Sequence, residues 1–177
     1  MAWSISGAVQ RCANRRVALA ALVGVAGCVA GLAWRQARLA GLELLDTRGW
    51  YTPQEAAALF DALDRLDGDA TFVYAITALT IDMVFPACYG LLLAVLLFRL
   101  FGGGAPFYLL PLSVALADVL ENATVAALAL SHDGTPSPLA WPAAAFTLAK
   151  TVLIFATLAA VVAGAALRLR AGVRRSA

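Results

Sequence analysis

The stretch Ala140–Leu167, AWPAAAFTLAKTVLIFATLAAVVAGAAL, decides the class of fold. A helix needs about 20 mostly apolar residues to cross the hydrocarbon core of a bilayer, and this stretch exceeds that length. It is interrupted by Lys150, the only lysine of the chain. A charge near the bilayer centre costs roughly 2.5–3.5 kcal/mol. Lys150 must therefore meet a partner, be neutralised or face water.

The composition extends this interpretation to the whole chain. Of its 177 residues, 62% are hydrophobic and 14% are charged, with a mean hydropathy of +0.83. Soluble domains carry roughly 25% charged residues. The chain is expected to be one multi-pass membrane domain over residues 1–177, with the lipid bilayer as its environment and no nucleic-acid partner. One histidine and three scattered cysteines predict no metal and no cofactor.

Four apolar runs predict an all-α bundle of four membrane-spanning helices, at about 17–34, 71–99, 107–130 and 140–167. Arginine placement predicts their orientation, because cytoplasmic flanks are rich in basic residues. With four crossings, one side carries Arg11, Arg15, Arg16, Arg99, Arg168, Arg170, Arg174 and Arg175. The other carries Arg35, Arg38, Arg48 and Arg65 beside seven acids from Glu43 to Asp69. Both termini are expected in the cytoplasm, and the arginine-rich, lysine-poor usage favours a bacterial inner membrane.

The segment 35–70 is the main extramembrane piece. Thr52-Pro53-Gln54-Glu55 combines an N-cap, a proline in the first turn and a capping-box glutamate. Apolar residues at helical spacing follow, so an amphipathic helix is predicted over about 53–67. It is expected to lie on the outer membrane surface or to cap the bundle, as a solvated lid or as a surface for a partner.

The first span leaves two interpretations open. Gly24, Gly27 and Gly31 fit close helix packing, with Gly27 and Gly31 at the spacing of a small-residue face. Val25-Ala26-Gly27-Cys28 also fits a loose lipoprotein cleavage pattern, which would leave a lipidated Cys28 and three spans. The apolar sequence continues to Trp34, which favours an uncleaved span.

Two loops contain residues that could suggest chemistry. Gly102-Gly103-Gly104 is expected to form a cytoplasmic hairpin and lacks the spacing of a phosphate-binding loop. His132 lies in the loop before Pro136, where a turn residue is the favoured interpretation over a ligand or base.

Four ionisable residues fall inside the apolar runs: Asp82, Asp118, Glu121 and Lys150. At a rise of 1.5 Å per residue they lie roughly 14–18 Å below the outer boundary, so three helices deliver them to one layer. Because unpaired charges facing lipid are costly, we expect Lys150 to pair with at least one of the acids. Three acids against one lysine leave a deficit of two charges, which protons or a cationic group must fill for at least part of the time.

The third span supplies most of this layer. Asp118, Glu121 and Asn122 stand at i, i+3 and i+4 and therefore share one helix face. A polar clamp between helices needs only a residue such as Asn122, whereas two acids one turn apart favour a functional site that holds a proton. Both interpretations remain open here.

The second and fourth spans add further candidate site residues. Pro86 cannot donate to the carbonyl of Asp82, so it predicts a structural kink at the residue that carries a buried acid. Tyr89 adds a hydroxyl on the same face. On the fourth span Thr147 precedes Lys150 by three residues, and Thr157 extends the polar stripe.

The chain resembles a family of small bacterial four-span membrane proteins of unassigned function. The resemblance rests on Asp82-x-x-Phe85-Pro86-x-x-Tyr89-Gly90, Asp118-x-x-Glu121-Asn122, Thr147-x-x-Lys150 and Tyr51-Thr52-Pro53, and it covers roughly residues 44–155. It implies an integral membrane location and nothing about reaction or ligand.

Three functions compete. The first is a site that binds or passes a proton, a cation or a small amine-bearing ligand, which would need a homo-oligomer or a membrane partner because four helices are few for a transporter. The second is a structural or assembly subunit whose polar cluster sets helix register. The third is an intramembrane enzyme with a carboxyl acid–base pair acting on a lipid-like substrate. No nucleophile with an adjacent base is recognisable, which favours the non-enzymatic functions.

Overall fold

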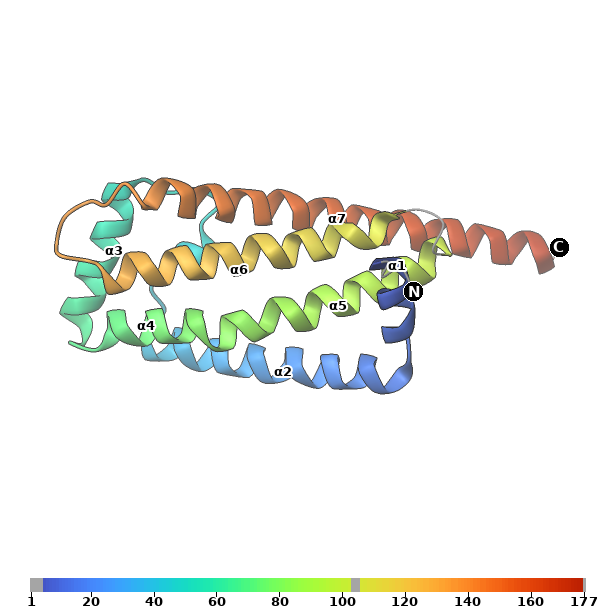
Figure 1. Cartoon of the computed structure of the whole chain (residues 1–177), viewed down its shortest axis with the longest axis horizontal. Coiled ribbons are helices and arrows are strands. Elements are labelled where there is room, and N and C mark those ends of the chain that lie inside the picture. The colour runs from blue at the N-terminus through green and yellow to red at the C-terminus, as the bar shows by residue number, and fades with distance from the viewer. Residues whose placement is uncertain (1–4, 103–105, 177) are drawn as a thin grey trace.

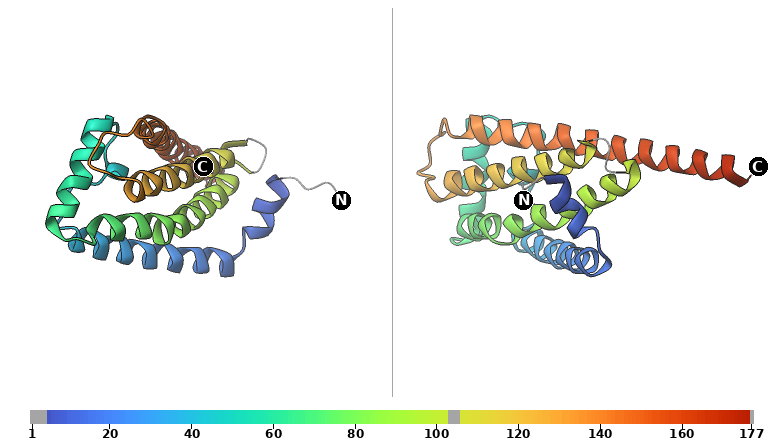
Figure 2. Two further views of the ribbon diagram at one scale, coloured as in Figure 1. Left: turned by 60° about the vertical axis from the view of Figure 1, so that its left-hand side comes forward. Right: turned by 45° about the vertical axis from the view of Figure 1, so that its right-hand side comes forward.

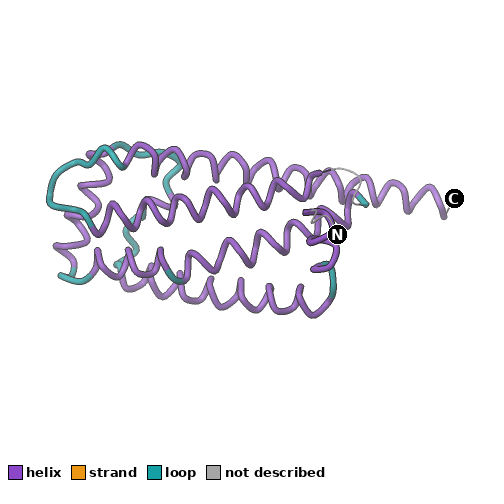
Figure 3. Tube along the Cα trace, in the orientation of Figure 1, coloured by secondary structure: helices purple, strands orange, loops and turns teal. Residues whose placement is uncertain are grey.

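The computed structural model describes residues 5–102 and 106–176, with side chains described to residue 171. The described residues form helices and contain no strand (Figures 1 and 3). The α-helices are α1 (Ile5–Cys12), α2 (Arg15–Arg38), α3 (Pro53–Leu66), α4 (Ala70–Leu79), α5 (Ile81–Phe101), α6 (Leu109–Leu130) and α7 (Ala140–Ser176). Two short 3₁₀ turns, η1 (Leu45–Thr47) and η2 (Pro106–Tyr108), complete them.

Within the described ranges, four helical segments are long and apolar enough to cross a membrane: Arg15–Arg38, Ala70–Phe101, Pro106–Leu130 and Ala140–Ala171. They form the predicted all-α four-helix bundle, in which α6 packs against α4, α5 and α7, and α2 packs against α5. The helix α1 and the C-terminal end of α7 lie at one end of the bundle, and α3 crosses the other end (Figures 1 and 2). This arrangement is compatible with the predicted topology. Of the arginines used to predict it, Arg174 and Arg175 have side chains outside the described part.

The helix α3 begins as the sequence predicts. The Thr52 hydroxyl accepts from the backbone amide of Glu55, and the Glu55 carboxylate accepts from the backbone amide of Thr52 at 2.7 Å. The apolar face of α3, with Phe60 and Leu63 fully buried, packs on a core that includes Tyr74 of α4 and Val125 of α6. Of the two predicted positions, α3 therefore takes the one that caps the bundle.

The predicted second span consists of two helices. The break lies at Thr80, where φ is −118° and ψ is −82°, and α5 continues through Pro86. Proline fits a helix once the carbonyl four residues earlier finds another donor. That carbonyl belongs to Asp82, and it accepts from the side-chain amide of Asn122 at 2.7 Å. The interruption of this span thus lies six residues before the proline at which the sequence places a kink.

The first span packs closely through two of the three predicted glycines, and the third, Gly27, is not in contact. A Cβ added at Gly31 would come within 2.8 Å of Ile81 Cδ1, and one at Gly24 within 2.5 Å of Cys88 Sγ. A Cβ at Gly27 would meet nothing within 4 Å. The close-packing face is therefore Gly24 and Gly31, two turns apart, because α2 crosses α5 along that line.

Two further features concern the end of the bundle that carries α1. The helix α1 was not predicted, and its Val9 packs with Ala94 and Val95 of α5. Gly102 ends α5 with φ at +69°, a conformation that glycine adopts at little cost. The other two residues of the predicted hairpin, Gly103 and Gly104, lie outside the described residues.

Candidate functional site

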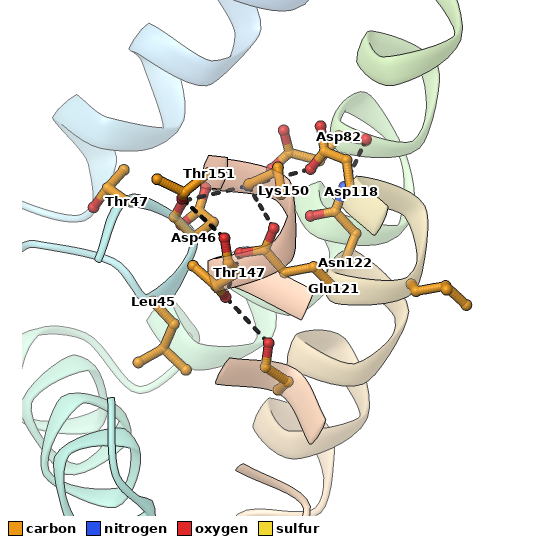
Figure 4. A network of polar contacts seen from close by, with 12 residues as sticks. Leu45, Asp46, Thr47, Asp82, Asp118, Glu121, Asn122, Thr147, Lys150 and Thr151 are labelled. Atoms are coloured by element: carbon orange, nitrogen blue, oxygen red, sulfur yellow. Dashed lines mark hydrogen bonds and ion pairs between the residues drawn. The ribbon is translucent and has the colours of Figure 1, made fainter. Parts of the chain in front are cut away.

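A buried polar network joins the candidate site residues inside the bundle, and Figure 4 shows the part of it around Lys150. We use the name polar network for the following residues, which are linked by hydrogen bonds or ion pairs: Arg35, Asp46, Tyr74, Asp82, Tyr89, Asp118, Glu121, Asn122, Thr147 and Lys150. They come from α2, η1, α4, α5, α6 and α7. The network includes every residue that the sequence predicted to bind a ligand or a proton.

Lys150 forms the ion pairs that the sequence predicts. Its Nζ lies 2.5 Å from Glu121 Oε2 and 3.3 Å from Asp118 Oδ1. Glu121 has no exposed surface, and its second carboxylate oxygen accepts from the Thr147 hydroxyl at 2.8 Å. Two acids on one face of α6 thus share one cation from α7, which removes much of the repulsion expected between them.

A second ion-paired centre was missed by the sequence analysis. Arg35 is 4% exposed, and its two terminal nitrogens lie 2.5 Å from Asp82 Oδ2 and 2.7 Å from Asp46 Oδ2. The Tyr74 hydroxyl lies 3.1 Å from Asp46 Oδ1, and the Tyr74 ring lies 5.5 Å from the Arg35 guanidinium carbon. Asp82 therefore pairs with an arginine of the first span and not with Lys150.

This error has a physical origin. Arg35 directly follows the predicted first span, and an arginine in that position normally marks the membrane boundary. In the structure α2 continues to Arg38, so Arg35 lies on the helix and points into the bundle. The excess of buried acids over Lys150 was the signal that could have indicated a second cation.

The segment between α2 and α3 contributes directly to the polar network. Leu44, which precedes η1, and Leu45, its first residue, are fully buried. The turn thereby places the Asp46 side chain in an ion pair with Arg35. The backbone carbonyl of Asp46 accepts from Lys150 Nζ at 3.3 Å. Asp46, which the sequence analysis counted among the loop acids, therefore touches both buried cations.

The remaining contacts join α5 to α6. The Tyr89 hydroxyl lies 2.8 Å from Asp118 Oδ2, and Asn122 bonds the carbonyl of Asp82. Tyr89 was expected beside Asp82 on its own helix, and the structure instead directs it to the acid of the neighbouring helix. Asn122 acts as the predicted clamp, because its amide holds α6 against the part of α5 that Pro86 leaves without an intrahelical bond.

The charges of the polar network do not balance. Among the described residues it contains four acids, Asp46, Asp82, Asp118 and Glu121, and two cations, Arg35 and Lys150. Four negative charges against two positive charges leave two in excess. The sequence predicts three buried acids and one lysine. Arg35 and Asp46 were not among the predicted residues, but they add one charge of each sign, so the deficit of two positive charges is the same.

A buried phenol next to the network lacks a partner. Tyr51 has no exposed surface and precedes α3; its hydroxyl faces Thr147 but is outside hydrogen-bonding geometry to every described residue. Burial raises the pKa of the Tyr51 hydroxyl, and the nearby negative charges of Glu121 and Asp46 raise it further. Tyr51 thus remains a neutral donor beside Glu121.

The bundle has two hollows to consider, of which only the second shares a residue, Tyr89, with the polar network. A groove of about 540 Å³ lies beside the helix break and is lined by residues such as Gly27, Cys28, Thr80 and Met83. A second cavity of about 230 Å³, which we call the α5–α7 pocket, is lined by Phe85, Tyr89, Leu93, Val114, Ile154, Thr157 and Leu158. Thr157, which the sequence placed in a polar stripe with Lys150, bonds the Leu153 carbonyl of its own helix at 2.8 Å.

His132 differs from the expectation of a simple turn residue. Its Nε2 lies 2.8 Å from Asp61 Oδ1 of α3, and its ring packs 5.2 Å from the ring of Phe60. The histidine therefore fastens the loop after α6 to the capping helix. Among the described residues there is no group of three or more histidine, cysteine or acidic side chains arranged to hold a metal ion.

Comparison of the chain with protein-family models, curated proteins and solved structures finds no match. The four apolar helices and the buried charged residues fit a membrane protein.

Proposed function

We propose that this chain is a multi-pass protein of a bacterial inner membrane, with both termini in the cytoplasm, whose polar network binds or passes a proton, a cation or a small amine-bearing ligand. We also propose kinship with the small four-span bacterial proteins that its motifs resemble. A homo-oligomer or a membrane partner would complete a path across the bilayer.

The observation that carries this proposal is the excess of two buried negative charges. An unpaired charge at membrane depth costs several kcal/mol, whereas a proton or a bound cation removes that cost. Asp118 and Glu121 share one ammonium group, and Asp46 and Asp82 share one guanidinium group. Each pair of acids thus carries one negative charge in excess.

The contacts also suggest a route for that charge. Tyr89 bonds Asp118, Asp118 pairs with Lys150, and Lys150 bonds the carbonyl of Asp46 in the outer segment. Lys150 contacts Asp118 and Glu121 at the same time, so a proton taken up by one acid leaves the other paired with the lysine.

A structural role is the second candidate, and one observation favours it. Arg35 joins α2, η1 and α5 through two short ion pairs, which is the geometry of a tether between the first span and the rest of the bundle. The tether would set the register of these elements with no ligand. This role and the proposed one make opposite predictions for the amide variants.

Infrared titration of the carboxyl stretch tests the proposal in reconstituted protein. We expect a protonated carboxyl band at pH 7 that is reduced in Asp118→Asn or in Glu121→Gln, because the Asp46–Asp82 pair keeps its own proton, while the helical amide signal is retained. Glu43→Gln, at a side chain that is 72% exposed in the segment between α2 and α3, is the control and should leave the band unchanged. If all four network acids are ionised at pH 7 and none titrates between about pH 5 and 8, the structural role replaces the proposed one.

A further inference from the structure

The α5–α7 pocket lies one helical turn from the centre of the polar network. Val114 precedes Asp118 by four residues on α6, and Ile154 follows Lys150 by four residues on α7. Tyr89 belongs to both regions, because its side chain lines the pocket while its hydroxyl bonds Asp118. The pocket itself is lined by apolar surface and no acid, and the Tyr89 hydroxyl is its link to the buried carboxylate of Asp118.

The wall of the pocket is suited to an apolar chain that ends in a cation. The side chains of Leu93, Val114, Ile154 and Leu158 provide aliphatic surface. At the end nearest Asp118, the rings of Phe85 and Tyr89 meet edge to face at 5.1 Å. Aromatic faces attract ammonium groups, and the attraction grows when water is excluded. An apolar pocket with a few convergent polar groups is the usual form of a small-molecule site.

The charge of the polar network and the volume of the α5–α7 pocket limit which apolar molecules could bind. The excess of carboxylates favours a positive head group and disfavours a phospholipid, whose phosphate would face Asp118 and Glu121. At roughly 30 Å³ per water-sized group, a cavity of about 230 Å³ holds about eight non-hydrogen atoms. That volume suits one short chain.

We propose that the α5–α7 pocket binds a single-chain hydrophobic amine, with its alkyl chain among Leu93, Ile154 and Leu158 and its ammonium group at Tyr89, whose hydroxyl links it to the Asp118 carboxylate. This site deepens the proposed function and rests on it, because the ammonium group fills one of the two missing positive charges.

Calorimetry on the full chain in phosphatidylcholine nanodiscs tests the site with n-alkylamines of four to ten carbons. After subtraction of the partitioning of each amine into protein-free nanodiscs of the same lipid, we expect the affinity to rise about fourfold per methylene, which corresponds to about 0.8 kcal/mol, and to level off near eight carbons. Octan-1-ol, which matches octylamine in length but has no charge, should bind at least tenfold more weakly. Equal affinities of octylamine and octanol would show an unselective apolar cavity and overturn the proposal. This comparison needs no variant.

Two tryptophan variants of α7 locate the site. Ile154→Trp fills the pocket and should lower octylamine affinity at least tenfold, whereas Val152→Trp, at a position that is 58% exposed on the same helix, should leave it unchanged. Equal binding by both variants places the amine elsewhere and overturns the site. A loss of octylamine binding on adding phosphatidylethanolamine to the nanodisc identifies a lipid as the occupant and also overturns it.

The carboxyl titration separates this inference from the function on which it rests. If wild-type protein shows the protonated carboxyl band and octylamine does not bind, the amine site is wrong and the proton-binding function stands. If the band is absent and octylamine does not bind, both fail. If octylamine binds and reduces the band at constant pH, the ammonium group has replaced the proton, as we expect.

Discussion

Replacing Lys150 by methionine removes the cation that Asp118 and Glu121 share, at nearly constant side-chain volume. The Lys150–Glu121 separation of 2.5 Å corresponds to an attraction of about 7 kcal/mol at an effective dielectric constant of about 20. Desolvation of both groups offsets much of this attraction, and removal of one partner from a buried pair typically costs about 3–5 kcal/mol. Lys150 is only 12% exposed and Glu121 is fully buried, so the variant should fall within that range.

Glu121→Gln tests whether the loss arises from this pair. The double variant Lys150→Met/Glu121→Gln removes both charges, so it should be more stable than the sum of the single effects by at least about 1 kcal/mol. Reversible unfolding of purified protein in mixed micelles, followed by circular dichroism, gives the four free energies that the cycle needs. Arg38→Met is the matched control, because its pairs with Asp67 and Asp69 are partly exposed and should contribute about 0–1 kcal/mol. Additive effects in the cycle would refute the shared-cation description.

Three further predictions follow from packing, capping and topology. Gly31→Val should destabilise the bundle by about 1–3 kcal/mol, because its Cβ would come within 2.8 Å of Ile81 Cδ1, whereas Gly27→Val should be tolerated; thermal unfolding compares them. The backbone and side-chain hydrogen bonds of Thr52 lower the pKa of Glu55, so its contribution to stability is present above its ordinary value of 4.5 and is lost as the pH falls through the lowered folded-state pKa. Glu55→Gln should therefore reduce the loss of stability on acidification below pH 4.5, and an unchanged acid limb would contradict this capping role. A cysteine on the exposed face of α3 should react with an impermeant maleimide from outside intact cells, and reaction only after lysis would reverse the proposed topology.

Local sequence patterns determined the elements of this protein. The capping box at Thr52 and Glu55 acts within one turn, so it was readable without tertiary information. Apolar runs determined the four-helix class, because in lipid every backbone polar group must be satisfied within a helix. The spacing of Asp118, Glu121 and Asn122 determined that they share a face of α6, and the cost of buried charge predicted their pairing with Lys150.

The tertiary structure decided the roles of residues whose partners lie on other helices. Arg35 looks the same in sequence at a membrane boundary and in a buried ion pair, and only the approach of η1 and α5 selected the second role. Gly24 was preferred to Gly27 for close packing because α2 crosses α5 at one angle, which no local pattern encodes. Asp46 lies in the short turn η1, and a segment of three residues has no apolar periodicity from which burial could be predicted. Hydropathy and helical spacing are short-range properties, whereas the composition of the polar network depends on contacts between residues as far apart as Asp46 and Lys150.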